Sequence, residues 1–449
     1  MKIACRPRRQ DRDLHAAIDA AFRHNQWYRM TMPAPARLPG KNAFLFVVVA
    51  VALNMLSFGL IMPIMPALLA ELTNQPIEIA IKSNGWLAVV FAVANFLAMP
   101  LLGGLSDKYG RRPILLISIA MLGVDMVILG LAPTLGILFL GRALAGVFSG
   151  TVSVANAYVA DVTAPEERGR AFGILGAAFG FGFILGPVFG GLLGEIHTRL
   201  PFFVAAGIAG LNFLYGYFVL PESLAPENRR EFSLARANPF GAVKHFSKLP
   251  RVAWFIVTIG VFQIAHSVYP TTWNYHGASR YGWSEWEIGL SLGAVGLGSA
   301  LSQAVLSGWL IKRLGAMRAA MLGLGVHVIA MTGFAFAIHP WMAFAMIAVS
   351  AVGGVVMPAI NTITANLTPM NAQGELQGAQ SSIMAFTLIF SPILMTQTFS
   401  AYTAPGAPVH FAGAAFVLAA LIAALAMIPF LIGVRANRDA VAAVANPAE

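Results

Sequence analysis

Long runs of apolar residues recur along nearly the whole chain, and they constrain its fold more than any other feature. A run of about 20 apolar residues is long enough to cross the hydrocarbon core of a bilayer as a helix. Of the 449 residues, 58% are hydrophobic and only 11% are charged, whereas a soluble globular domain has roughly 25% charged residues. The chain therefore cannot cover a water-soluble surface of its size, and it belongs in lipid.

Twelve such runs are predicted between charged or Pro/Gly-containing breaks. Because the runs are continuously apolar and do not alternate with polar residues, they predict helices rather than the strands of a barrel. The predicted fold class is therefore an all-α integral membrane protein. The first six spans are expected near residues 42–70, 82–105, 113–132, 135–160, 170–194 and 201–220, and the second six near residues 252–275, 286–311, 318–337, 340–365, 375–400 and 409–433.

A repeat with a constant offset divides the twelve spans into two related six-helix halves. A shift of 205 positions brings several residues into register, among them Gly103 and Gly308, Gly110 and Gly315, Gly173 and Gly378, and Pro187 and Pro392. Two parallel repeats predict a transport pathway at their interface, exposed alternately by rocking of the halves. We expect a basic arm at 1–41, one bundle at 42–220, a linker at 221–251, a second bundle at 252–433 and a tail at 434–449.

The net charge of +10 reflects the placement of Lys and Arg rather than a nucleic-acid partner. With an even number of spans, both termini lie on one side of the membrane. Besides the basic arm, the loops on that side hold sixteen Lys and Arg residues, whereas the opposite loops hold only Lys82, Arg199 and Arg280. By the positive-inside rule, both termini are expected in the cytoplasm. The arm lacks the apolar core of a cleavable leader, and the single Cys5 excludes an internal disulfide or a Cys-based metal site.

A polar, glycine-containing loop connects the second and third spans. Gly103 and Gly110 permit a tight turn, and Arg111 and Arg112 follow it directly. Asp107 is expected either to accept hydrogen bonds from Arg side chains or to lie against a helix N-terminus, a contact that can latch one conformation. An ordinary basic loop is the alternative.

The fifth span carries three glycines four residues apart, Gly182, Gly186 and Gly190, around Pro187. Small residues at this spacing let two membrane helices pack backbone to backbone, and the proline removes one helical hydrogen bond. On physical grounds alone, this segment is a helix-packing motif.

Two formal charges remain within the spans after the helix ends are set aside, Asp125 and Arg142. A lone charge in hydrocarbon is costly, so it needs a partner or a function. Both residues lie about eight positions from the turn near Pro133, so they sit at similar depth and are expected to pair. The pair is either static or contains a proton carrier, Asp125. His266 and His327 also lie within spans and are further candidates for proton coupling, with a structural role as the alternative.

Amides, a hydroxyl and aromatic rings at membrane depth supply candidates for a substrate pocket. Polar groups within a span must face a cavity or another helix, and aromatic rings suit a flat organic substrate. Aromatic side chains that face lipid are the alternative. No clustered His and Asp set is found, so no catalytic residue and no metal site is predicted. The candidate substrate-binding residues are Asn54, Ser57, Asn156, Phe179, Phe183, Gln263, Asn361 and Phe386.

These motifs resemble those of the major facilitator superfamily. The loop from Gly103 is similar to the signature loop of that superfamily, and Gly182–Gly191 is similar to the antiporter signature of twelve-helix drug exporters. With Ala160–Arg168, Leu220–Ser223 and Gly374–Gly378, they resemble the tetracycline-efflux branch of the drug:proton antiporters. The resemblance implies the major facilitator fold, location in the bacterial inner membrane, and exchange of a drug for a proton by alternating access.

The resemblance also implies membrane acids in the first, third and ninth spans, and a substrate carried as a divalent-metal chelate. Asp125 is the acid of the third span, but Asn54 and His327 stand at the other two positions. Asn54 cannot carry a proton or balance the charge of a cationic chelate. The identity of the substrate therefore stays undecided. We expect a monomeric, proton-coupled exporter of drug-like molecules, without a bound cofactor, whose partners are a small-molecule substrate, protons and lipid. A transporter of a small, anionic metabolite is the main alternative, and a uniporter or a multi-spanning enzyme is a remote one.

Overall fold

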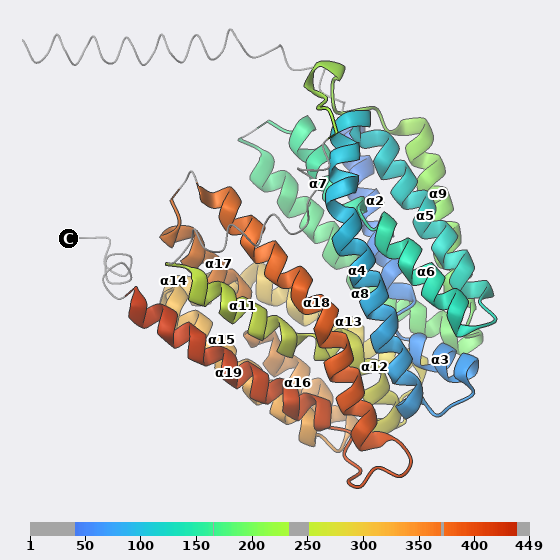
Figure 1. Cartoon of the computed structure of the whole chain (residues 1–449), viewed down its shortest axis with the longest axis vertical. Helices are drawn as coiled ribbons and strands as arrows, with labels where there is room; N and C mark the ends of the chain where they lie inside the picture. Colours follow the sequence, from blue (N-terminus) through green and yellow to red (C-terminus); the bar gives the residue numbers. More distant parts are fainter. Residues whose placement is uncertain (1–40, 165, 233–250, 370–371, 438–449) are drawn as a thin grey trace, which may run out of the picture.

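A computed structural model describes residues 41–164, 166–232, 251–369 and 372–437. The predicted arm lies almost wholly outside the described residues, as do most of the predicted linker and tail. Within the described residues every regular element is a helix (Figure 1), and twelve spans are long and apolar enough to cross a membrane. The predicted all-α fold with twelve spans is thereby confirmed.

The first half of the chain contributes six spans, two of which consist of two helices each. In chain order the helices are α2 (Lys41–Leu60) and α3 (Met65–Thr73), α4 (Ile77–Tyr109), α5 (Arg111–Leu131), α6 (Leu135–Phe148) and α7 (Thr151–Val162), α8 (Arg168–Ile196), and α9 (Leu200–Val219). A short 3₁₀ turn, η1 (Pro226–Asn228), follows in the linker.

The second half contributes the other six spans, three of which are divided. In chain order the helices are α11 (Ala253–His266) and α12 (Val268–Tyr281), α13 (Glu285–Leu301), the π-helical turn η2 (Ser302–Leu306) and α14 (Ser307–Leu314), α15 (Ala316–Phe336), α16 (Pro340–Gly353) and α17 (Val356–Leu367), α18 (Gln373–Thr403), and α19 (Ala414–Ala436).

A π-helical turn interrupts the eighth span, and breaks that were not predicted divide the first, fourth, seventh and tenth spans. In three of them a proline lies close after the break: Pro66 in the first, Pro270 in the seventh and Pro358 in the tenth. Proline has no N–H to donate to the carbonyl four residues earlier, so the helix opens at that carbonyl. In the first span the carbonyl freed in this way belongs to Met62, and the side-chain amide of Asn274 on α12 donates to it.

Helix α8 lies between the two halves. Its small residues pack closely against α2 of the first half and α13 of the second half. A Cβ added to Gly182, Gly186 or Gly190 would collide with the backbone of α2. On another face of α8, the backbone around Gly191 packs against α13, where a Cβ on Gly289 would collide with the Pro187 carbonyl. The predicted packing role of the glycine motif is therefore present, and α8 runs on through Pro187 as one helix.

The two halves pack together at one end of the bundle. We call the end where α4 meets α5, beside residues 220–232, the linker end, and the other the opposite end. Three hydrogen bonds between described residues join the halves at the opposite end: Asn84 Nδ2 to the Thr271 carbonyl at 3.2 Å, Ser279 Oγ to Glu78 Oε1 at 3.0 Å, and Asn274 to Met62. Figure 1 shows the halves converging there, beside α12 and α18, and diverging toward the linker end.

Glycines near the linker end fit this asymmetry. A Cβ added to Gly103 of α4, to Gly173 of α8 or to Gly374 of α18 would meet no atom within 4 Å. At the opposite end, by contrast, a Cβ on Gly85 of α4 would collide with Thr396 of α18. The halves are therefore joined at the opposite end, and their helices diverge toward the linker end.

Candidate functional site

The two charges within the spans form a buried ion pair between α5 and α6. Arg142 Nη2 donates to Asp125 Oδ2 at 2.5 Å, and the side chains are 12% and 1% exposed, respectively. Adjacent packing of α5 and α6 brings them together across the short turn between these helices. The predicted pairing is therefore present, whereas the role of the pair in proton coupling stays a prediction.

The pairing leaves one carboxylate oxygen of Asp125 without a partner. Asp125 Oδ1 is buried and accepts no hydrogen bond, and Arg142 Nε is also buried without an acceptor. Gly141 of α6 leaves the space beside this oxygen, because a Cβ there would come within 2.9 Å of it. A carboxylate oxygen in this state is an open position for a proton. Removing either partner of such a buried pair costs about 3–5 kcal/mol, because the other charge is left unpaired.

The two histidines singled out from the sequence also come together, in the second half. The ring centroids of His266 on α11 and His327 on α15 are 5.6 Å apart, and Phe262 contacts both rings. Tyr269 of α12, which the sequence analysis did not single out, completes the group with its centroid 5.2 Å from that of His266. Their predicted role in proton coupling is not tested by this geometry.

The candidate substrate-binding residues occupy different environments. Ser57 is fully buried, and its hydroxyl donates to the Leu53 carbonyl of its own helix at 2.9 Å, so it is not available to a ligand in this conformation. Phe386 is 57% exposed and packs against Phe390, with centroids 4.6 Å apart. A substrate-binding role stays a prediction for all of them. Asn54, Phe183 and Gln263 are partly buried, and Asn156, Phe179 and Asn361 are exposed.

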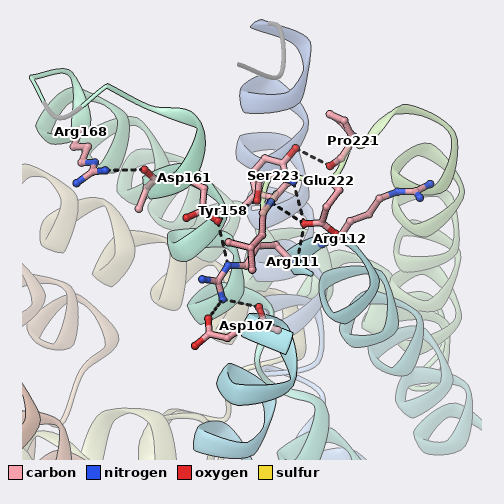
Figure 2. A network of polar contacts seen from close by, with 12 residues as sticks. Asp107, Arg111, Arg112, Tyr158, Asp161, Arg168, Pro221, Glu222 and Ser223 are labelled. Atoms are coloured by element: carbon pink, nitrogen blue, oxygen red, sulfur yellow. Dashed lines mark hydrogen bonds and ion pairs between the residues drawn. The ribbon is translucent and has the colours of Figure 1, made fainter. Parts of the chain in front are cut away.

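At the linker end, Arg111 is the centre of a polar network (Figure 2). Its guanidinium contacts Asp107 at 2.5 Å, Ser106 at 2.9 Å and, from α7, Asp161 at 3.2 Å. Ser223 of the linker donates to the same Asp161 oxygen at 3.2 Å. The segment from Gly103, predicted as a loop, is helical up to Tyr109, and only Gly110 separates α4 from α5. The network therefore ties the junction of α4 and α5 to the fourth span and to the start of the linker.

The acid at the N-terminus of α5 is Glu222, not Asp107. Glu222 Oε1 accepts from the backbone N–H of Arg111 at 2.8 Å, and Oε2 accepts from that of Arg112 at 3.2 Å. Gly110 has φ +108°, which turns the chain so that these N–H groups face Glu222. Of the two contacts expected for Asp107, only the pairing with Arg is present. A linker carboxylate complements the N-terminal end of the α5 dipole instead.

Replacing Glu222 by Ala is expected to lower the thermal stability of the purified protein. The variant leaves the first N–H groups of α5 without their acceptor, which costs about 0.5–2 kcal/mol for a helix cap. A thermal melt followed by tryptophan fluorescence measures the change. Glu227→Ala is the matched control, since Glu227 is exposed on η1. Equal melting temperatures for the two variants would contradict the capping role.

Similarity to known proteins agrees with this architecture. The model of the family described as Major Facilitator Superfamily matches residues 47–392 and 275–447. The class C tetracycline resistance protein of Escherichia coli is 36% identical over 81% of this chain and 91% of its own length, and the class G protein of Vibrio anguillarum is 35% identical over 80% and 91%. The crystal structure of the nucleoside transporter NupG superposes with a TM-score of 0.71, at 14% identity, covering 87% of this chain and 99% of that one.

The family match spans most of the chain, and both tetracycline resistance proteins align over nearly their full lengths. The resemblance read from the loop at Gly103 and from the glycine motif of α8 is therefore confirmed. The chain belongs to the Major Facilitator Superfamily, in the branch of the tetracycline resistance proteins.

Proposed function

We propose that the protein is a proton-coupled exporter of drug-like organic molecules that works by alternating access. The observation that carries this proposal is the ion pair of Asp125 and Arg142, buried within the spans with Oδ1 of Asp125 unpartnered. Among the described residues, these are the formal charges that lie away from the helix ends. A proton on Oδ1 neutralises the carboxylate and weakens its hold on Arg142, which then has donors free for other groups.

We infer the substrate class from the names of the similar proteins. Their names assign tetracycline resistance to several proteins that match most of this chain, and a multidrug resistance protein of Bacillus subtilis matches 79% of it at 28% identity. Planar drugs of this kind are therefore the first compounds to test. Small anionic metabolites belong in the same panel, because Asn54 and His327 replace two of the acids implied by the family resemblance.

The orientation is part of the proposal. The linker end carries most of the Lys and Arg residues, and on this ground we assign it to the cytoplasm, together with both termini. The described conformation, in which the halves join at the opposite end and diverge toward the linker end, is then the state that takes up a drug from the cytoplasm. Protons enter in the alternative state, through the opposite end, to which Asp125 lies closer than to the linker end.

Cysteine labelling is expected to confirm the orientation. In a Cys5→Ser background, a membrane-impermeant maleimide on intact cells should label His410→Cys and leave Glu227→Cys unlabelled. Both positions are exposed, and they lie in loops at opposite ends of the bundle. Inside-out membranes should reverse the pattern. Labelling of Glu227→Cys in intact cells would contradict the assignment.

Uptake into inside-out vesicles tests the transport function. With an acidic lumen, the vesicles should accumulate at least one compound from a panel of tetracyclines, other planar drugs and anionic metabolites. A protonophore should abolish the accumulation, because the proton gradient drives it. Entry that stops at equal concentrations inside and outside, and that a protonophore leaves unchanged, would identify a uniporter. A panel without any transported compound would contradict a role in drug export.

A further inference from the structure

A cluster of two imidazoles and one phenol lies where the seventh span breaks. His266 is the last residue of α11, Tyr269 is the second residue of α12, and His327 lies at the middle of α15. The ring centroids are 5.2 Å apart for His266 and Tyr269, 5.6 Å for the two histidines, and 6.2 Å for Tyr269 and His327. We call these three residues the imidazole cluster.

One polar atom of the imidazole cluster is buried without a hydrogen-bond partner. His327 is 2% exposed, and its Nε2 makes no hydrogen bond, whereas the hydroxyl of Tyr269 lies beside the side chain of Ser350 as a hydrogen-bond partner. Buried polar groups nearly always have a partner, and leaving one unpaired costs about 1–3 kcal/mol. Nε2 of His327 is therefore a position where a ligand can supply the missing partner.

His266 gives a ligand access to the imidazole cluster. Its side chain is exposed, although it touches the buried ring of His327 and lies within a span. An imidazole that faced hydrocarbon would be costly, so the exposed face points to a water-accessible path. Broken helices at membrane depth are also where transporters of this type form their sites. The cluster is thus reachable in the described conformation.

The charges around the imidazole cluster restrict what it can bind. Imidazole is neutral or positive and never negative, and the described residues contain no group of three His, Cys, Asp or Glu that could hold a metal ion. Glu78 and Lys82 of α4, which packs against α12, lie near the opposite end. The cluster can complement an acidic group, and it offers no negative charge to balance a cation. In the described second half, the Asp, Glu, Lys and Arg residues all lie at or near helix ends: Arg251, Arg280, Glu285, Glu287, Lys312, Arg313, Arg318, Glu375 and Arg435.

We propose that the imidazole cluster is a subsite for the acidic hydroxyl or carboxyl edge of a flat substrate. An acidic hydroxyl of the ligand donates to an imidazole nitrogen, and the Tyr269 hydroxyl donates to the ligand oxygen. If the proton passes to the imidazole, the products are a phenolate and an imidazolium, and the net charge of the site is unchanged. The inference rests on the proposed transport function and names the chemical class that the transporter selects.

Equilibrium binding to the purified full-length protein tests this subsite. The probes are the flat phenol 4-methylumbelliferone, its methyl ether 7-methoxy-4-methylcoumarin and the flat cation ethidium, all with EDTA present. The phenol should bind about tenfold more tightly than the ether, the factor expected for one strong hydrogen bond. Tyr269→Phe and His266→Phe, which keep the ring packing, should remove this difference and leave the affinity for the ether unchanged. His410→Phe, in an exposed loop, should change nothing.

Three results would overturn the subsite. One is equal binding of the phenol and the ether by the unmodified protein, and another is a preference for ethidium or no binding of either coumarin. The third is an equal loss of phenol and ether affinity in Tyr269→Phe and His266→Phe, which would show a structural role only. The selectivity for the phenol requires no proton gradient. If it persists while vesicles accumulate nothing, the transport proposal fails and the subsite stands.

Discussion

Replacing Asp125 by Asn is expected to abolish proton-driven transport while substrate binding persists. Asn cannot take up or release a proton, and removing an essential proton-transfer group lowers a rate by a factor on the order of a hundred or more. Substrate-dependent discharge of a pH gradient, measured in vesicles with equal amounts of folded protein, reports the effect. Transport at the unmodified rate would show that the pair with Arg142 is a static ion pair.

The effect of Asp125→Asn on folding needs its own control, because the substitution leaves Arg142 unpaired within the membrane. Asp125→Asn with Arg142→Gln removes both charges, so it should restore the thermal stability without restoring transport. Glu71→Gln is the matched acid-to-amide control, since Glu71 pairs with Arg199 near the opposite end and is 50% exposed. It should transport at the unmodified rate.

Gly190→Val is expected to prevent accumulation of folded protein. A side chain at Gly190 collides with the backbone of Leu60 at the end of α2, and backbone cannot move aside as a side-chain tip can. Overpacking of a buried site typically costs about 1–3 kcal/mol, and here it also separates two helices that pack along their length. The monodisperse fraction in size-exclusion chromatography of the detergent extract measures the loss.

Gly180→Val tests whether this loss comes from packing rather than from valine in a membrane helix. Gly180 lies on the same helix, α8, and a Cβ there meets no atom within 4 Å. The variant should give close to the unmodified yield of folded protein. Equal losses for the two substitutions would contradict the packing role assigned to the glycine motif.

Much of the fold could be predicted from the sequence, because only helices and closed barrels can satisfy their backbone hydrogen bonds in hydrocarbon. All twelve spans follow from that rule, and the packing of α8 follows from the spacing of its glycines. The breaks within the spans were not predicted, because spans are predicted from hydropathy. A break depends instead on a backbone carbonyl that has no N–H donor four residues later. Pro66, Pro270 and Pro358 each lie a few residues after a break. Proline alone does not mark a break, because Pro100, Pro187, Pro392 and Pro429 lie inside unbroken helices.

Part of the candidate site could be predicted, because the distance of a residue from a turn gives its depth in the membrane. The parts that depend on contacts between residues distant in sequence could not be predicted. Asp125 and Arg142 were paired from their equal distances to one turn, and the structure pairs them. Glu222 lies 111 residues from the N–H group of Arg111 that it caps, and no local pattern indicates such a contact. Tyr269 was missed because a tyrosine in an apolar run resembles any other core aromatic residue.

Proton movement caused by substrate alone tests the central claim most directly. Vesicles containing the purified protein and a trapped pH dye start without a pH gradient, and the compound accumulated in the uptake assay is then added outside. We predict that substrate entry moves protons out, so that the lumen becomes alkaline with the unmodified protein and does not change with Asp125→Asn. Entry of labelled substrate without any change in dye signal would contradict proton coupling through Asp125.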